Sequence, residues 1–262
     1  MKSLHRARKR FGQNFLHDQS IIEQIIHALG PKAKQSIIEI GPGKGALTAA
    51  LLNSGANLTA IEIDRDLAAL LEQTFGGQAN FRLLEQDVLQ LDFNSLLSPE
   101  NPGRIIGNLP YNISTPLIFH LLAYLPGIID MLFMLQLEVV ERMRATPGSK
   151  AYGRLSIMCQ YYCEVEKLFE VPPLAFSPAP KVTSAIVRLR PRNQPQTMLE
   201  DPKQLESLVR QAFAQRRKTL RNNLQGLVSA EQLQALDIDP GLRPENLSLQ
   251  DYVRICRWLA QK

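Results

Sequence analysis

The chain has 262 residues, of which 45% are hydrophobic and 21% charged, and this composition excludes a disordered, fibrous or repeat protein. At roughly 150 residues per domain, it has room for one large domain, with or without a small one. Thirty Lys and Arg residues outnumber 25 Asp and Glu residues, and the formal net charge of +5 favours a polyanionic partner. Three cysteines are too few for a disulfide framework, so we expect a reducing compartment and neither structural zinc nor another bound metal.

The start of the chain is basic, with five Lys and Arg and no acidic residue among the first ten. It lacks the apolar stretch of a secretory signal, and Asp18 and Glu23 follow too soon for a typical transit peptide. Residues 116–137 are apolar, but a histidine, a proline, a glycine and an aspartate interrupt them, so they indicate helix, turn and buried strand rather than a membrane span. We predict a cytoplasmic protein with no membrane partner.

From Ser36 onward, short apolar segments alternate with segments of helical spacing. The predicted strands are 36–40, 57–63, 80–88, 103–110 and 128–136, and the predicted helices between them are 43–54, 64–75 and 114–124. This alternation is typical of a parallel sheet covered by helices, with functional residues at the strand ends. A further helix at 154–162 precedes two β-like segments, 163–169 and 183–190, which we expect to complete the sheet.

A polar, proline-containing segment at 191–202 is typical of a linker, and we place the domain boundary between residues 192 and 193. Residues 1–192 then hold the basic N-terminal segment and the α/β domain. Residues 193–262 form a small all-helical domain, because they show helical spacing and no strand-like run. The helices expected in that domain are 205–213, 216–224, 229–236 and 247–260.

A glycine-rich loop, Gly41-Pro42-Gly43-Lys44-Gly45, joins the first strand of the sheet to a helix. Glycines let backbone amides approach a ligand closely, and the loop fits a dinucleotide fingerprint. Glu62 ends the next strand 21 residues beyond Gly41, at the distance expected for a ribose-binding carboxylate. No Ser or Thr follows Lys44, which excludes a Walker A loop, but nicotinamide and S-adenosylmethionine both remain open as cofactors at this point.

Two further carboxylates favour S-adenosylmethionine. Glu39, at the mouth of the loop, would oppose a pyrophosphate and suits a cationic sulfonium. Asp87, after the third strand, can accept a hydrogen bond from an adenine amino group, although it could simply cap the following turn.

The segment Asn108-Leu109-Pro110-Tyr111 follows the fourth strand. The exocyclic amine of adenine is a poor nucleophile because its lone pair is delocalised into the ring, so an enzyme must hold the amine rigidly. The Asn108 side-chain oxygen and a backbone carbonyl stiffened by proline can accept its protons, and the Tyr111 ring can stack on a displaced base. A tight turn would explain the proline and the asparagine but not the aromatic residue.

These motifs together, Glu39–Gly45, Glu62, Gln86–Val88 and Asn108–Tyr111, form the pattern of the ribosomal RNA adenine N6-dimethyltransferases, a family that the chain resembles throughout. Three further segments strengthen the resemblance. Arg10–Leu16 is similar to the family's N-terminal motif over the cofactor, Phe176–Val182 resembles its second substrate-stacking loop, and Gln215–Asn222 resembles the bacterial enzymes of the small subunit.

The resemblance implies a Rossmann-like S-adenosylmethionine-dependent methyltransferase sheet and a set of site residues. Glu62 would bind the ribose hydroxyls and Asp87 the adenine of the cofactor, and Tyr111 and Phe176 would sandwich the target adenine. The residues implied to contact S-adenosylmethionine are Asn14, Leu16, Gly41, Glu62, Asp87 and Asn108. Those implied at the catalytic centre are Asn108, Leu109, Pro110, Tyr111 and Phe176.

The resemblance further implies that two adjacent adenines near the 3′ end of 16S rRNA are dimethylated late in assembly of the small ribosomal subunit, which is the implied partner. A basic group at helical spacing in the C-terminal domain is assigned to rRNA phosphates, with a solvated helix face as the alternative. Its members are Arg216, Arg217, Lys218 and Arg221. The alternative functions are a large-subunit rRNA adenine N6-methyltransferase and a non-catalytic rRNA-binding assembly factor. A nicotinamide dehydrogenase would leave Asn108–Tyr111 unexplained.

Overall fold

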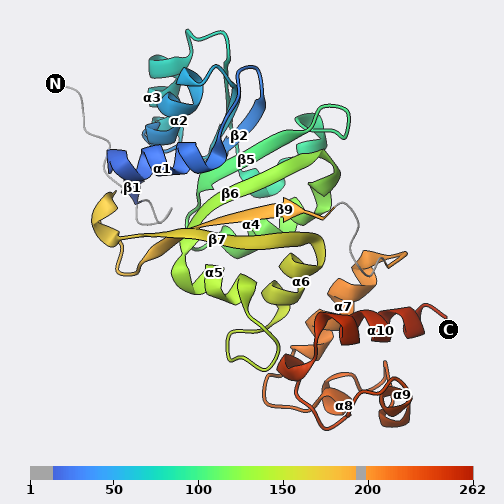
Figure 1. The fold of residues 1–262 in the computed structure, drawn as a ribbon. Helices are drawn as coiled ribbons and strands as arrows, with labels where there is room; N and C mark the ends of the chain where they lie inside the picture. Colours follow the sequence, from blue (N-terminus) through green and yellow to red (C-terminus); the bar gives the residue numbers. More distant parts are fainter. Residues whose placement is uncertain (1–13, 193–198, 262) are drawn as a thin grey trace. The chain divides into compact units, whose positions relative to one another are not determined.

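The computed structural model describes residues 14–192 and 199–261 (Figure 1). The first ten residues, part of the N-terminal motif and half of the predicted linker therefore lie outside the described residues. The chain divides into two compact units: unit 1 comprises the residues up to Val140 and Glu166–Pro191, and unit 2 comprises Glu141–Val165 and the residues from Arg192 onward. Unit 2 thus includes a segment that we predicted within the first domain, and the division into domains 1–192 and 193–262 stays a prediction.

A seven-stranded sheet forms the centre of unit 1, in the order β4-β3-β2-β5-β6-β9-β7. Strands β2 to β6 pair in parallel, and β9 runs antiparallel to β6. The bounds are β2 (Ser36–Ile40), β3 (Asn57–Glu62), β4 (Phe81–Glu85), β5 (Gly103–Asn108), β6 (Ile128–Gln136), β7 (Cys163–Val171) and β9 (Ser184–Pro191). The predicted α/β fold class is confirmed, including the two later strands that complete the sheet.

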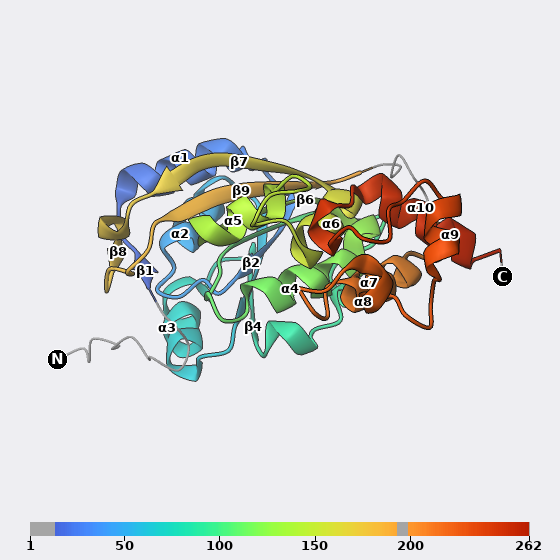
Figure 2. The same cartoon turned by 90° about the horizontal axis from the view of Figure 1, so that it is seen from below.

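The central strands β2, β5 and β6 are buried on both faces. This burial explains why their sequences are nearly continuous apolar runs, as is typical of parallel sheets. Helices α1 (Gln19–Leu29), α2 (Ala46–Asn53) and α3 (Arg65–Phe75) share one apolar cluster with Ile37, Leu58 and Ile106 of the sheet. Helix α4 (Ser114–Leu121) lies on the other side of the sheet (Figure 2). Since α1, α2 and α3 bury one sheet face and leave the strand ends open, the fold creates room for a site at that edge.

The apolar stretch that could have suggested a membrane segment folds as predicted, into α4, a 3-10 turn η4 (Leu122–Gly127) and β6. Within residues 14–192 and 199–261, no helix is long and apolar enough to cross a membrane. The three cysteines are free and buried.

Helix α1 is an element that sequence reasoning missed. Asp18 caps its first turn by accepting hydrogen bonds from the amides of Ser20 and Ile21, and Gly30 ends it in the left-handed conformation with φ 59°. An aspartate before an apolar helical pattern and a glycine after it are recognised start and stop signals. The helix could therefore have been predicted from its sequence.

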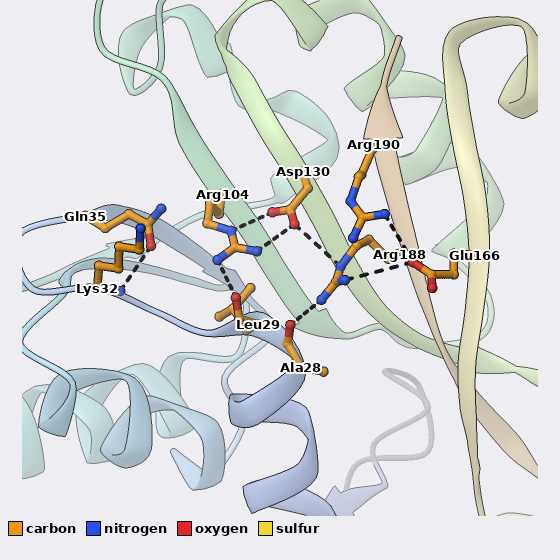
Figure 3. A network of polar contacts seen from close by, with 9 residues as sticks. All are labelled: Ala28, Leu29, Lys32, Gln35, Arg104, Asp130, Glu166, Arg188 and Arg190. Atoms are coloured by element: carbon orange, nitrogen blue, oxygen red, sulfur yellow. Dashed lines mark hydrogen bonds and ion pairs between the residues drawn. The ribbon is translucent and has the colours of Figure 1, made fainter.

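The C-terminal end of α1 is anchored by a buried ion network (Figure 3). Arg104 makes two hydrogen bonds of 2.6 Å to the Asp130 carboxylate and donates a third to the Leu29 carbonyl. Arg188 lies 3.6 Å from the same carboxylate and donates to the Ala28 carbonyl. Cations suit the negative end of a helix, so the network fixes the C-terminal end of α1 to β5, β6 and β9.

Unit 2 is helical in the described residues 199–261, which confirms the predicted helical C-terminal part. Its helices α6 (Arg154–Tyr162), α7 (Pro202–Ala212) and α10 (Leu249–Leu259) pack against one another, and the shorter helices are α8 (Leu220–Asn223) and α9 (Ala230–Ala235). Helix α5 (Leu137–Arg144) begins in unit 1 and ends in unit 2.

The predicted helix over 216–224 is wrong in extent, because helical structure covers Leu220–Asn223 alone and residues 216–218 form a turn. The side-chain amide of Asn223 donates to the carbonyls of Gln215 at 3.1 Å and Lys218 at 3.4 Å. These bonds occupy carbonyls that a continuous helix would have used, and they stabilise the turn instead.

Candidate active site

A pocket of about 290 Å³ opens where four strands of the sheet end. Gly41 follows β2, Glu62 ends β3, Asp87 follows β4 and Asn108 ends β5, and all four line the pocket together with residues 14–16. The predicted residues that the structure brings to its lining are Asn14, Leu16, Gly41, Glu62, Asp87, Asn108, Leu109, Pro110 and Tyr111. Phe176 is absent from this lining, and the four basic residues belong to unit 2.

The glycine loop passes close to an aromatic ring. Gly43 has φ +60°, and a Cβ built on it would lie 3.1 Å from Cδ1 of Phe15, so a side chain there would be strained in its backbone and crowded against the Phe15 ring. Its amide donates to Oε2 of Glu62 at 3.2 Å. The Lys44 ammonium lies 4.6 Å from the centre of the Phe15 ring, a cation–π contact. The loop therefore brings the N-terminal segment and the β3 carboxylate to one wall of the pocket.

Glu62 is held by backbone donors around its carboxylate. Oε1 accepts from the amides of Ile63 at 2.9 Å and Asp64 at 3.0 Å, and Oε2 accepts from Gly43. Burial raises the pKa of Glu62, while these three hydrogen bonds oppose the rise. An ionised carboxylate has about four acceptor positions, so both oxygens can still accept hydroxyl groups. The geometry fits a ribose-binding residue.

Glu39 contributes a second carboxylate to the pocket and is 2% exposed. The Thr48 hydroxyl donates to its Oε2 at 2.6 Å. Burial raises the pKa of Glu39 to about 7, and the negative charge of Glu62 adds to the rise. Two carboxylates on one small pocket favour a cationic ligand and oppose a pyrophosphate, as the residue types alone indicated.

Asp87 combines the two roles that the sequence left open. Its Oδ1 accepts from the amide of Leu89 at 3.0 Å and caps the short helix η2 (Val88–Gln90), yet the residue also lines the pocket. Ile63, directly after Glu62, lines the pocket as well and is 47% exposed, which offers apolar surface to a flat ring. Sequence reasoning missed Ile63, although its place after the strand-ending acid was a usable signal.

Asn108 is oriented by the N-terminal segment. Its Nδ2 donates to the backbone carbonyl of Asn14 at 3.0 Å. Since the NH₂ group carries both donors of the amide, this bond directs the nitrogen toward Asn14 and leaves Oδ1 to serve as an acceptor. The next residue, Leu109, is 1% exposed, and its amide donates to the Met134 carbonyl at 3.2 Å, which ties the segment to β6.

Tyr111 lines the same pocket and is half-buried. Its hydroxyl lies 3.1 Å from the hydroxyl of Ser184, at the start of β9. Its carbonyl accepts from the Ser114 hydroxyl, also at 3.1 Å. Tyr111 is thus held at both ends, by its side-chain hydroxyl and by its backbone carbonyl.

Phe176 lies in a different environment from the one that the resemblance implied. It belongs to the two-residue strand β8 (Phe176–Ser177), which pairs antiparallel with β1 (Phe15–Leu16), and Leu16 is its partner. The side chain is 3% exposed and packs in the same apolar cluster as Leu16 and α1. A stacking role would require the ring to leave this cluster, and the role stays a prediction.

In unit 2 the four predicted RNA-binding side chains are exposed, whereas Leu220 and Leu224 are fully buried. The guanidinium of Arg216 donates to the Lys150 carbonyl at 2.7 Å. The segment 216–221 is therefore a basic turn leading into α8, with its apolar residues directed inward.

The parallel sheet with a glycine loop after β2, an acid ending β3 and an Asn-Leu-Pro-Tyr segment after β5 defines a Rossmann-like methyltransferase. Residues 4–261 match the model of the family described as ribosomal RNA adenine dimethylase. The chain belongs to this family, whose members are rRNA adenine dimethyltransferases, and the predicted family and enzyme class are confirmed.

Several known proteins are similar to the chain over nearly its whole length. It is 57% identical to the ribosomal RNA small subunit methyltransferase A of Hahella chejuensis, over 97% of this chain and 93% of that protein. The protein of the same name from Pseudomonas aeruginosa is also 57% identical, over 98% and 96% of the two chains. Among solved structures, a dimethyladenosine transferase from Plasmodium falciparum superposes with a TM-score of 0.80 at 27% identity, over 94% of this chain and 98% of that one. The 23S rRNA methyltransferase ErmE superposes with a TM-score of 0.71 at 27% identity, over 95% and 100%.

Proposed function

We propose that this protein transfers methyl groups from S-adenosylmethionine to N6 of two adjacent adenines near the 3′ end of 16S rRNA. It acts in the cytoplasm, late in assembly of the small ribosomal subunit, and produces N6,N6-dimethyladenosine. The observation that carries the proposal is that Asn108 and Tyr111 share one pocket with Glu39 and Glu62. The identity with small-subunit methyltransferases supports the choice of RNA.

The residues of the pocket fit the cofactor. Glu62 accepts the ribose hydroxyls, Asp87 accepts from the adenine amino group with the oxygen that is not capping η2, and Gly41 allows close approach of the backbone. Glu39 faces the positive charge. When bound, S-adenosylmethionine supplies an electrophilic methyl group on a cationic sulfur.

The Asn-Leu-Pro-Tyr segment holds the target amine. Oδ1 of Asn108, left as an acceptor by the bond to Asn14, takes one N6 proton, and a backbone carbonyl of the segment takes the other. Tyr111 stacks on the adenine, a contact worth about 1–3 kcal/mol per base. Among the described residues, no histidine or cysteine lines the pocket, which agrees with a reaction in which positioning supplies most of the catalysis.

The proposal places the rRNA backbone at the basic turn of unit 2, through Arg216, Arg217, Lys218 and Arg221. Exposure of all four side chains supports it, because phosphate contacts require accessible cations.

Methyl transfer to three RNA substrates tests the proposed function. Radiolabelled S-adenosylmethionine is supplied with unmethylated small subunits, large subunits or naked rRNA, and the modified base is mapped. We expect label on two adjacent adenines of 16S rRNA in small subunits. Label on the large subunit would support the alternative raised by the similarity to ErmE, and binding to small subunits without transfer would indicate a non-catalytic assembly factor.

A further inference from the structure

The hydroxyl of Ser184 is buried and lies within hydrogen-bond distance of a residue that lines the active-site pocket. Ser184 is 1% exposed, and its Oγ lies 3.1 Å from the hydroxyl oxygen of Tyr111, 73 residues earlier in the chain. In the described residues this is the hydrogen bond that the structure gives for the Ser184 side chain. A buried hydroxyl is therefore satisfied by the ring that lines the pocket.

The sheet fixes the position of Ser184. Its Cα is paired with that of Gln136 where β9 runs antiparallel to β6, and the neighbouring Thr183 carbonyl accepts from the amide of Leu137 at 3.0 Å. The serine is thus a rigid point on the sheet, beside the hydroxyl of Tyr111. A residue on a strand places its side chain more accurately than one on a loop.

Tyr111, by contrast, lies on a turn after β5, and its side chain can rotate about two bonds. The Ser114 hydroxyl restrains its carbonyl but not its ring. The bond to Ser184 restrains the hydroxyl at the far end of the ring, so the two contacts together fix the direction in which the ring projects from the backbone. A flat stacking surface contributes most when its orientation is set before the base arrives, because no rotamer freedom is then lost on binding.

We propose that Ser184 is a positioning residue for methyl transfer, which holds the Tyr111 ring in the orientation that receives the target adenine. The inference rests on the proposed function of Tyr111 and extends it to a residue that contacts neither substrate nor cofactor. It predicts that the hydroxyl groups of Ser184 and Tyr111 act as one unit.

A double-mutant cycle tests the proposal. A net hydrogen bond of ordinary strength corresponds to a loss of roughly twofold to tenfold, so Ser184→Ala should lower the single-turnover rate on small subunits by that factor. Tyr111→Phe should cause a similar loss, and the double variant should lose no more than either single variant. The affinity for S-adenosylmethionine should stay at the parental value in all three.

Ser156→Ala serves as the matched control. Ser156 is also fully buried and donates its hydroxyl to a carbonyl, that of Arg142, but both residues lie in unit 2. This variant should lose stability without losing the single-turnover rate. Ser184→Thr, which keeps the hydroxyl, should restore most of the rate lost in Ser184→Ala.

Three results would overturn the inference: an unchanged rate in Ser184→Ala, losses that add in the double variant, or a joint loss of thermal stability and cofactor affinity. The last result would show that Ser184 is a packing residue. An inactive parental protein would instead contradict the proposed function, so the two failures are distinguishable.

Discussion

The pocket of unit 1 and the basic turn of unit 2 are built in opposite ways. The pocket holds two buried carboxylates whose oxygens accept hydrogen bonds from neighbouring amides or a hydroxyl, whereas the turn exposes four cations. Buried charge selects a small ligand through fixed geometry. Exposed charge attracts a polyanion at long range and depends on salt. The difference predicts that substitutions in the pocket act on the cofactor and that substitutions in the turn act on RNA binding.

The largest effect is expected at Glu62. Glu62→Ala removes the carboxylate that we propose accepts two ribose hydroxyls, and charge-assisted hydrogen bonds are each worth about 1.5–3 kcal/mol. We expect S-adenosylmethionine binding to fall below detection in calorimetry while the protein stays folded. A folded variant with parental affinity would show that the ribose lies elsewhere.

Two aromatic residues differ in environment, since Tyr111 lines the pocket and Phe176 lies in the apolar core. Phe176→Ala should lower the free energy of unfolding by about 3–5 kcal/mol, because its ring is buried in the cluster that holds β1. Tyr111→Ala should keep the stability and the cofactor affinity but lose turnover, since a stacking face is worth about 1–3 kcal/mol.

Thermal melts and single-turnover rates of Phe176→Ala and Tyr111→Ala distinguish a packing role from a stacking role for each ring. If Phe176→Ala kept its stability and lost turnover alone, the stacking role implied by the family resemblance would hold for Phe176 as well. If Tyr111→Ala melted early and bound cofactor poorly, its ring would be a packing element.

Glu39 links the stability of the pocket to its function. Its pKa is raised from 4.5 to about 7, so the folded protein retains a proton there that the unfolded chain loses between these pH values. The stability that Glu39 contributes therefore falls as the pH rises from about 4.5 to about 7, by at most roughly 3 kcal/mol. Glu39→Gln should be more stable than the parent at pH 8, with the advantage shrinking toward pH 5.

The same substitution should weaken cofactor binding, because a neutral amide cannot pair with a sulfonium. In the parent, affinity should rise as the pH increases through 7, and the Gln variant should lack this dependence. Denaturant melts and calorimetry from pH 5 to pH 8 measure both quantities. A Gln variant that binds cofactor with the parental pH profile would contradict the assignment of Glu39 to the positive charge.

The two regions also differ in how far the sequence predicts them. Glu62 and Asn108 end parallel strands, and the period of a strand places such residues at one edge of the sheet. The burial of Phe176 depends on the pairing of β1 with β8, two short strands far apart in sequence that show no local pattern. The turn at 216–218 likewise depends on one side chain, Asn223, whose hydrogen bonds override helical spacing. Periodicity identifies regular elements but not single long-range contacts.

The smallest effect on the protein itself is expected from charge reversal in the basic turn. Arg217→Glu with Lys218→Glu should leave stability and cofactor affinity unchanged, because both side chains are exposed. Binding to small subunits should weaken, and its salt dependence should flatten, since each lost phosphate contact removes about 0.9 from the logarithmic slope on duplex DNA and about 0.7 on single strands.

Lys203→Glu with Arg210→Glu is the matched control, because both residues are exposed on α7 of the same unit and the change in net charge is equal. Filter binding across a salt series distinguishes a local contact from a general charge effect. If phosphates bind at the turn, the logarithm of the binding constant depends less steeply on salt in the variant at residues 217 and 218. The control variant then keeps a salt dependence close to that of the parent. Equal slopes in both variants would mean that the turn is a solvated surface and that the enzyme docks on rRNA through other residues.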